Sequence, residues 1–383
     1  MLDGGSLGIA KMSKFYSSNS EFELDIFTLE TPKHGFDIVD FRKEIPVKTE
    51  VFSVFVNTTP TISGAFKGII SNKSYNLSRF KNKKIEQKLI EILSKKEYDF
   101  IQLENIFVAL HLDVIRKFSK AKVILNSANI EYEIWKRLSS KASFFKRKYF
   151  KILANQLKTE EEEIWKKMDG IICATDKDKQ TIKKFVSEDK LITVPFYLNT
   201  NEYTYTKNEK KDAISFFHLG AMDWLPNVEG VNWFINSIWN NINQDNKLYL
   251  AGKGMPKPLI AQQSKTISVQ GFVDDAKEFM MAYDVMIVPL LSGSGIRVKI
   301  IEALALGKCI ISTTVGAEGI EYTNNKNILI ADTVDEFISC IETLINNPNK
   351  ITEIGSSARQ LAESRYDIQN MEKQLIPFFK KLK

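Results

Sequence analysis

The sequence is poor in cysteine and has no long apolar run. Its three cysteines stand apart within or beside apolar segments, at Cys173, Cys309 and Cys340. Scattered thiols of this kind exclude a disulfide framework and a cysteine zinc site, and they favour buried thiols in a reducing cytosol. No apolar stretch approaches the roughly 20 residues that a membrane-spanning helix needs. The first residues lack the basic and apolar parts of a signal peptide.

A large excess of charge of one sign is also absent. The chain has 53 Lys and Arg against 47 Asp and Glu, a net charge of +6. This balance allows an anionic partner such as a phosphate or a lipid head group, but it is too weak to indicate nucleic acid. The composition is globular, with 44% hydrophobic residues, and 383 residues fit two domains better than one.

The second half of the chain alternates short β-rich runs with helical periodicity. Strands that are apolar on both faces and alternate with helices are typical of a parallel sheet covered on both sides, and right-handed crossovers make it doubly wound. The predicted strands are Ser215–Gly220, Lys247–Ala251, Ile267–Val273, Val285–Leu290, Cys309–Thr314 and Asn327–Ile330. The predicted helices are Val228–Ile242, Ala276–Tyr283, Ile296–Leu306 and Val334–Ile345.

The first half repeats this α/β pattern less regularly. Its predicted strands are Leu24–Leu29, Val51–Val56, Tyr98–Leu103, Val123–Asn126, Gly170–Ala174 and Leu191–Val194. Its predicted helices are Ile85–Leu93, Phe107–Phe118 and a long helical stretch from Glu131 to Met168. Gly4 and Gly5 are typical of a strand-to-helix turn before a helix over 6–16, yet no strand precedes them. We therefore expect a first strand to lie in about 10–20 further residues before Met1, because that strand is normally central in a doubly wound sheet.

One segment combines phosphate-binding and diol-binding features. Ser292–Gly295 follows a predicted strand and opens a helix, so its backbone N–H groups and the helix dipole favour a phosphate. Arg297 and Lys299 oppose that dipole unless an anion is bound there. Glu302, about two turns further on, can accept two hydrogen bonds from a vicinal diol such as ribose. The alternative is a solvated surface helix whose glycines serve only the turn.

These residues resemble the retaining glycosyltransferases of the group 1, or family 4, type. The matching stretches of the second half are Phe217–Trp233, Leu250–Gly254, Gly271–Asp275 and Gly293–Gly319, and the similarity covers residues 214–365. The first half is similar more loosely, through Asp3-Gly4-Gly5 and Gln102-Leu103-Glu104. The resemblance implies the glycosyltransferase B fold: two Rossmann-like doubly wound domains facing across a cleft, here with the N-terminal domain lacking its first strand.

The resemblance also assigns residues to the reaction. It implies that Arg297, Lys299 and Glu302 form the catalytic site. The two cations would contact the departing nucleoside diphosphate, and the carboxylate would bind its ribose. It assigns residues to the donor from both domains and to the acceptor from the first one. The implied donor residues are Gly4, Gly5, Gly220, Phe272, Val273, Ser294 and Gly295, and the implied acceptor-side residues are Glu104, Asn129 and Glu131.

Two positions depart from the family pattern. The family commonly carries a glutamate eight positions before the second glutamate, and this chain has Ser294 there. Related enzymes often show His-Asn-x-Glu after a first-domain strand, whereas this chain has Ala128-Asn129-Ile130-Glu131. The first departure leaves the transferred sugar open, and the second leaves open the acceptor chemistry and activity itself.

The resulting expectation is a metal-independent glycosyltransferase of the hexosyl type. It uses a nucleotide-diphosphate sugar as co-substrate, requires no further cofactor, and transfers the sugar with retention to a saccharide or lipid-linked saccharide during cell-surface polysaccharide or glycoconjugate synthesis. The alternatives are a degenerate, non-catalytic partner of the same fold and a sugar-nucleotide epimerase. The expected domains are 1–205 on the acceptor side and 206–365 for the donor, with a C-terminal helix over 366–383 that packs back on the first domain.

Other charged segments have simpler explanations. Asp176 and Asp178 have the spacing of a metal motif, but they lie where a helix should start, and capping explains them better. The histidines His34, His111 and His218 are too scattered to form a metal site, so we expect none. Residues 141–151 interleave aromatic and basic side chains, which predicts either contact with an anionic membrane or packing of the aromatics on the domain itself. We expect a cytoplasmic protein. If residues 141–151 contact a membrane, we expect the protein at the inner face of the cytoplasmic membrane.

Overall fold

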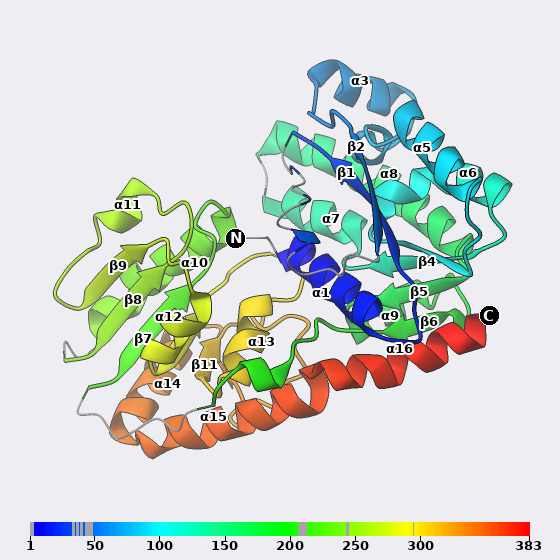
Figure 1. Cartoon of the computed structure of the whole chain (residues 1–383). Coiled ribbons are helices and arrows are strands. Elements are labelled where there is room, and N and C mark those ends of the chain that lie inside the picture. The colour runs from blue at the N-terminus through cyan, green and yellow to red at the C-terminus, as the bar shows by residue number, and fades with distance from the viewer. Residues whose placement is uncertain are drawn as a thin grey trace. The chain divides into compact units, whose positions relative to one another are not determined.

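The computed structural model describes residues 4–32, 35, 38, 41, 42, 49–141, 143–205, 213–242, 245–293 and 295–383. The chain divides into two compact units (Figure 1). Unit 1 consists of Met1–Pro195 and Glu372–Lys383, and unit 2 of Phe196–Met371. The division between Pro195 and Phe196 lies ten residues before the expected domain boundary after residue 205. The α/β fold class with parallel sheets, predicted from the alternating pattern, is confirmed.

Unit 2 is built on one parallel sheet with the strand order β12-β11-β10-β7-β8-β9. Its central strands are buried along their whole length, because their Val, Ile, Leu and Phe residues contact helices on both faces. All six predicted strands are confirmed, most of them one or two residues shorter than expected. They are β7 (Ser215–Leu219), β8 (Lys247–Ala251), β9 (Ile267–Gly271), β10 (Val285–Val288), β11 (Cys309–Ser312) and β12 (Leu329–Ile330).

The helices of unit 2 begin at residues suited to helix starts. Asp275 accepts hydrogen bonds from two backbone N–H groups at the start of α12, and Thr333 forms a capping box with Glu336 at the start of α14. The helices are α10 (Leu225–Ser237), α11 (Lys257–Ile260), α12 (Ala276–Ala282), α13 (Val298–Ala305), α14 (Val334–Asn346) and α15 (Asn349–Leu361), with short turns η3 (Thr200–Glu202), η4 (Trp239–Asn241) and η5 (Ala362–Tyr366).

Unit 1 holds two separate parallel sheets among its described residues. Strand β1 (Asp25–Glu30) pairs with β2 (Glu50–Phe55), and the second sheet has the order β3-β4-β5-β6. The strands of the second sheet are β3 (Phe100–Leu103), β4 (Lys122–Ser127), β5 (Gly170–Cys173) and β6 (Leu191–Thr193). All six predicted strands of the first half are confirmed. The strand expected before Met1 stays a prediction.

The helices of unit 1 correct two expectations. Helix α1 (Gly4–Ser18) already contains Gly4 and Gly5, which we had placed in a turn before it. The helical stretch from Glu131 to Met168 is two helices, α7 (Glu131–Lys141) and α8 (Phe144–Lys166), because the chain leaves the helical conformation at Ser143, which has a ψ of 158°. The others are α3 (Ile62–Ile70), α4 (Tyr75–Ser78), α5 (Lys83–Leu93), α6 (Leu112–Phe118) and α9 (Asp176–Ile182), with turns η1 (Ile106–His111) and η2 (Glu188–Lys190).

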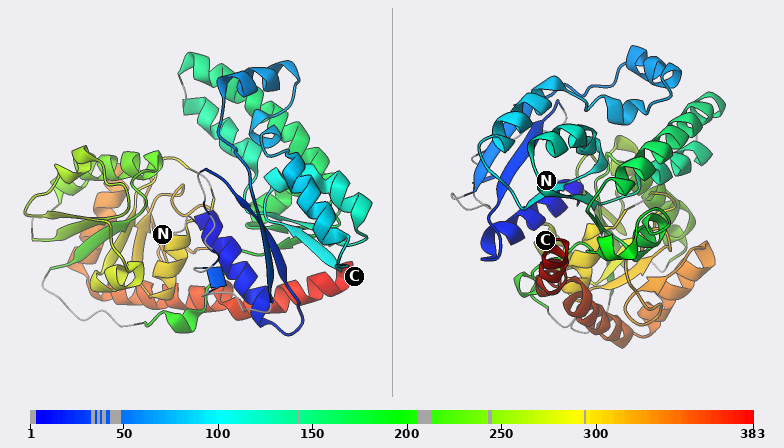
Figure 2. Two further views of the ribbon diagram at one scale, coloured as in Figure 1. Left: turned by 45° about the horizontal axis from the view of Figure 1, so that its top comes forward. Right: turned by 90° about the vertical axis from the view of Figure 1, so that its right-hand side faces the viewer.

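The last helix, α16 (Ile368–Leu382), ends in unit 1, to which Glu372–Lys383 belong. The end of α16 lies beside α1 (Figure 2). A cluster of rings joins the two helices, in which the ring of Phe379 lies edge-on to the rings of Tyr16 at 5.9 Å and Phe100 at 4.9 Å. Phe378 and Leu382 lie over Gly170, where a side chain would collide with them. The core of unit 1 is therefore completed by the last residues of the chain.

Candidate donor site

The candidate donor site of unit 2 lies where the strand order reverses. Strands β8 and β9 follow β7 on one side, while β10, β11 and β12 lie on its other side, so the reversal falls between β7 and β10. In open parallel sheets ligands bind outside the carboxyl ends of the strands at this point. Gly220 directly follows β7, and the loop 289–297 follows β10. The topology therefore brings the two predicted donor segments to the same edge of the sheet.

The loop after β10 needs glycine for its shape. Gly293 and Gly295 have φ values of +124° and +82°, which side chains other than glycine rarely adopt. A Cβ on Gly293 would lie 2.6 Å from the guanidinium of Arg297 and 2.8 Å from the ring of Trp224. The loop thus approaches both side chains closely, and a side chain at Gly293 would displace one of them. Ser294 lies outside the described residues.

Arg297 occupies the N-cap of α13, one position earlier than predicted. We had placed it in the first turn, but its ψ of 90° is not helical, and the helix begins at Val298. Its guanidinium donates to the carbonyl of Gly295 at 2.6 Å and lies 5.1 Å from the centre of the Trp224 ring. The cation is therefore held at the start of the helix by the loop and by an aromatic face.

Glu302 is buried and lies in the second turn of α13. Its carboxylate forms an ion pair with Lys299 at 2.7 Å and accepts a hydrogen bond from the hydroxyl of Tyr203 at 3.2 Å. The Glu302 side chain is 8% exposed and that of Lys299 is 28% exposed. A carboxylate has about four lone-pair sites, so two remain for a vicinal diol.

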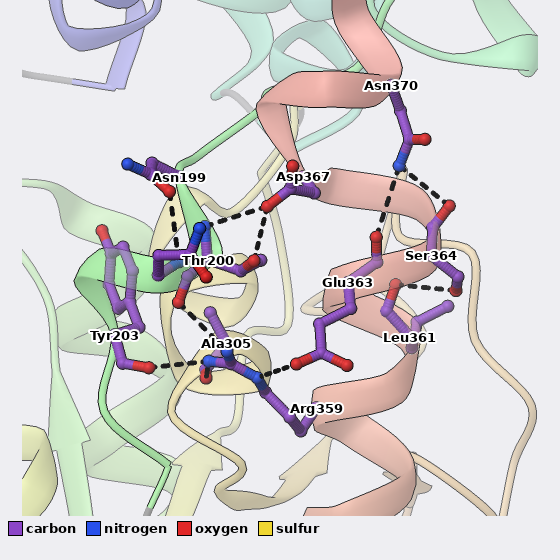
Figure 3. Close-up of polar contacts among 11 residues, drawn as sticks. Asn199, Thr200, Tyr203, Ala305, Arg359, Leu361, Glu363, Ser364, Asp367 and Asn370 are labelled. Carbon is purple, nitrogen blue, oxygen red and sulfur yellow. Dashed lines mark hydrogen bonds and ion pairs between the residues drawn. The ribbon is translucent and has the colours of Figure 1, made fainter.

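A second network holds Tyr203 in place (Figure 3). Arg359 of α15 donates to the carbonyls of Tyr203 at 2.7 Å and of Thr200 at 3.1 Å, and also to the carbonyl of Ala305 at the end of α13. The backbone N–H and the hydroxyl of Thr200 donate to Asp367 at 3.1 and 2.5 Å. The segment before β7 is thereby fixed to α13, and Tyr203 is directed at Glu302.

The other predicted donor residues of unit 2 lie at the same carboxyl edge. Gly220 adjoins the side chain of Asn227, whose amide donates to the carbonyl of Ala221 at 2.9 Å. Phe272 follows β9 and is 54% exposed, while Val273 packs partly on the core. An exposed aromatic ring suits the face of a nucleobase. Gly4 and Gly5 belong to unit 1, and the assignment of both to the donor stays a prediction.

The acceptor-side prediction for Glu104 falls on a polar network in unit 1. Its carboxylate accepts from the side-chain amides of Gln102 at 2.5 Å and Asn126 at 2.7 Å. The hydroxyl of Tyr16 donates to Gln102 at 2.7 Å. Burial raises the pKa of Glu104 above its ordinary value, although its amide partners favour the charged form. These groups meet at the carboxyl ends of β3 and β4.

Asn129 and Glu131 lie in the turn from β4 to α7. The hydroxyl of Ser127 donates to the carbonyl of Asn129 at 3.2 Å. Glu131 is the first residue of α7. The carboxylate of Glu161 in α8 caps this helix start, because it accepts hydrogen bonds from the backbone N–H of Glu131 at 2.9 Å and from that of Tyr132. Burial raises the pKa of Glu131 to about 7 and that of Glu161 to about 8.

The signals set aside as structural have partners that explain them. The backbone N–H of Asp178 donates to the Thr175 hydroxyl, and the Asp178 carboxylate accepts from that hydroxyl. The Asp-x-Asp spacing is therefore explained by capping at the start of α9. His218 is buried, its Nδ1 lies 2.8 Å from the carbonyl oxygen of Ile287, and burial lowers its pKa to about 4. His34 lies outside the described residues. Within the described ranges no three His, Cys, Asp or Glu side chains cluster so as to hold a metal ion.

Comparison with solved structures defines the class of protein. The chain matches sucrose-phosphate synthase from Thermosynechococcus elongatus with a TM-score of 0.70 at 13% identity, over 99% of this chain and 93% of that one. It matches HepE from Anabaena, in complex with UDP-glucose, with a TM-score of 0.66 at 14% identity, over 99% and 96%. The predicted glycosyltransferase B fold is therefore confirmed over the whole chain.

The family likeness is more specific and lies in the donor unit. Residues 213–347 match the family described as "Glycosyl transferases group 1", so the resemblance drawn from the sequence is confirmed for the part that contains α13. A relative from Klebsiella pneumoniae, described as "Uncharacterized 44.6 kDa protein in cps region", is 24% identical over 299 residues, covering 74% of this chain and 75% of that protein.

Sequence reasoning found the cations and the carboxylate of α13 but missed what holds them. Tyr203 and Arg359 lie about 100 and 60 positions away from Glu302 along the chain, and neither belongs to a recognisable motif. Trp224 lies within the matching stretch Phe217–Trp233, yet nothing in its local pattern indicates that its ring supports Arg297. These residues become visible only when the fold brings distant segments together.

Proposed function

We propose that the protein transfers a sugar from a nucleotide-diphosphate sugar to an acceptor hydroxyl. One observation carries the proposal: at the strand-order reversal, Arg297, Lys299 and Glu302 are assembled on one short helix behind a loop of small residues. Two cations and a helix start suit a diphosphate, and a buried carboxylate with free lone pairs suits a ribose diol. The group 1 glycosyltransferase likeness of this same segment supports the assignment.

The chemistry follows from where charge develops. As the bond between sugar and phosphate breaks, negative charge grows on the diphosphate, and the preorganised cations of Arg297 and Lys299 stabilise it. Because these cations neutralise the leaving group, we propose that transfer needs no divalent metal. We further propose retention, in which the acceptor hydroxyl attacks on the face that the diphosphate leaves, and a hexose as the transferred sugar.

The comparisons support a choice of substrates to test first. HepE structures hold UDP-glucose, UDP and glucose, and the Klebsiella relative is described as lying in a cps region. We propose a UDP-sugar as donor and a growing saccharide, free or lipid-linked, as acceptor in polysaccharide synthesis. A lipid-linked acceptor would place the protein at the cytoplasmic face of a membrane, with residues 141–151 as a contact. In the described residues no helix has both the length and the apolar character to cross a bilayer.

The test is incubation with a panel of nucleotide sugars, followed by detection of the released nucleoside diphosphate. Turnover of one donor, undiminished by EDTA, supports the proposal, and NMR of the product's anomeric proton distinguishes retention from inversion. Binding of a nucleoside diphosphate with no turnover of any donor and acceptor would support the non-catalytic partner instead, which the changes at Ala128 and Ser294 favour. Failure to bind any of them would contradict both functions.

A further inference from the structure

Helix α3 is attached to unit 1 by its small residues. Gly64 lies against the ring of Tyr75 so closely that a side chain would collide with it, and a Cβ on Gly68 would lie 3.0 Å from the carbonyl of Lys73. The Tyr75 hydroxyl also accepts from the backbone N–H of Thr61, the N-cap of α3, at 2.8 Å. The glycine face of the helix is therefore the packed face.

The large apolar side chains of α3 consequently point to solvent. Ile62 is 92% exposed, Phe66 65%, Ile69 40% and Ile70 71%. Their spacing of four, seven and eight residues places them on one helical face, opposite the glycines. Phe55, at the end of β2, is 54% exposed. An amphipathic helix normally buries such a face, and a contiguous exposed apolar face indicates an interaction surface.

Two segments that reach this end of the unit are rich in basic residues, and Glu160 directly follows the second. Residues 51–85 contain six Lys and Arg and no Asp or Glu, and residues 134–159 contain eight and none. Removing these 14 from the chain's 53 basic residues leaves 39, against 47 acidic ones. The remainder of the chain is therefore net acidic, and the positive charge is concentrated in these two segments.

The two segments lie beside each other in the fold. The side chain of Gln156 in α8 donates to the carbonyl of Gly68 at 3.2 Å, and the backbone N–H of Ser74, just after α3, donates to Glu160 of α8 at 3.1 Å. All views show α3 and the start of α8 at one end of unit 1 (Figures 1 and 2). Phe144, at that start, is 75% exposed, and the three basic residues 146–148 are exposed.

We propose that α3 and the start of α8 bind the surface of an anionic bilayer, with the apolar face of α3 inserted among the lipids. Apolar side chains surrounded by Lys and Arg match the boundary between acyl chains and anionic head groups. A second copy of this chain fits the surface poorly, because pairing would place two basic surfaces against each other. This inference deepens the membrane contact proposed above: it assigns insertion to α3 and leaves 141–151 as the charged part.

Vesicle sedimentation tests the proposal on the full chain. We expect the wild-type protein to sediment with vesicles of phosphatidylcholine and phosphatidylglycerol and to stay in solution with phosphatidylcholine alone. Replacing Ile62 and Ile70 by Ser should weaken binding about a hundredfold, since two large apolar side chains no longer enter the lipid. The matched control replaces the exposed Ile260 and Met281 of unit 2 by Ser and should bind like the wild type.

A second variant pair separates charge from insertion. Replacing Lys146, Arg147 and Lys148 by Gln should also weaken binding about a hundredfold, at the usual contribution of a basic residue near an anionic surface. The control replaces three exposed lysines of unit 2, Lys257, Lys265 and Lys326, and should retain binding. As a gain of signal, Phe66→Trp should show blue-shifted emission, relative to the wild type, when anionic vesicles are added.

The outcomes distinguish this inference from the proposed function. The membrane-binding inference is overturned if the wild type does not sediment with anionic vesicles or if the α3 variant binds them like the control. It is also overturned if the Phe66→Trp emission does not shift. It is also overturned if the wild type is a dimer without lipid that the α3 changes dissociate, since a second copy then covers the face. Nucleoside diphosphate binding in the absence of vesicles reports on the proposed function alone and should be the same in every variant.

Discussion

The two units share one construction, parallel sheets with covering helices, but the carboxylates of their candidate sites have different surroundings. In unit 2, Glu302 is buried, forms an ion pair with Lys299 and accepts a hydrogen bond from the hydroxyl of Tyr203. Among its described residues, this unit contains a single six-stranded sheet. In unit 1, Glu104 has only amide partners, and burial raises the pKa of Glu131. A site that binds a fixed diphosphate needs permanent charges, whereas an acceptor-side carboxylate can hold or release a proton. The contrast suggests fixed electrostatics in unit 2 and adjustable protonation in unit 1.

The largest expected effect concerns the cation at the start of α13. Replacing Arg297 by Met should lower turnover about a hundredfold, because one preorganised positive charge is lost where the diphosphate leaves. We expect the same of Lys299→Met. The matched control is Arg365→Met, which removes an exposed cation of unit 2 paired with Glu321. Steady-state rates with a competent donor and acceptor measure the effect, and wild-type rates in both variants would show that α13 does not hold the diphosphate.

The next effect concerns nucleotide affinity. Glu302→Ala should weaken binding of the nucleoside diphosphate by about 1.5–3 kcal/mol, since the ribose loses its charged acceptor. Isothermal titration compares this variant with Glu342→Ala, an exposed change on α14. Equal affinities in the two variants would show that Glu302 does not bind the ribose.

A smaller effect tests whether Tyr203 positions Glu302. Tyr203→Phe removes one hydrogen bond to the carboxylate and should weaken nucleotide binding about fivefold, or about 1 kcal/mol. Tyr249→Phe, in β8 of the same unit, is the control. A merely structural role would lower the melting temperature without changing affinity, so the titration and a thermal melt are measured together.

The last effect concerns stability and tests the comparison in unit 1. A carboxyl whose pKa rises from 4.5 to about 7 on folding stabilises the folded state below pH 4.5, and this stabilisation is lost as the pH rises through 7. Glu131→Gln stays neutral, so its free energy of unfolding should fall less between pH 5 and 8, by roughly 2–3 kcal/mol. Denaturant unfolding across this range compares it with Glu133→Gln, whose carboxylate pairs with Arg137. Identical slopes in both variants would contradict the raised pKa.

Much of the fold was predictable because its signal is local. The fully buried strands β5, β10 and β11 are short apolar runs, because burial on both faces of a parallel sheet demands such runs. Helix starts were harder: Arg297 caps α13 although the predicted helix began at Ile296, and Ser143 interrupts a pattern that continues on both sides. Neither Arg297 nor Ser143 is itself a strong helix breaker.

The site was predictable in its chemistry but not in its support. Arg297, Lys299 and Glu302 lie within six residues and form a motif, so the sequence alone indicated a diphosphate and a diol. Tyr203, Arg359 and Asp367 act across the chain, and only the fold brings them together. The outward face of α3 was equally hidden, because an apolar helical stripe normally predicts burial, and here the glycines on the opposite face reverse it.

Hydrogen–deuterium exchange of the wild-type chain with and without a nucleoside diphosphate tests the central claim most directly. If the donor site is the loop and helix after β10, saturating ligand should protect the backbone amides of residues 293–302, while those of the exposed helix α3 in unit 1 should exchange as before. The ligand is chosen as the tightest binder of a panel that includes UDP. Binding that leaves residues 293–302 unprotected would contradict the assignment of the donor site to α13.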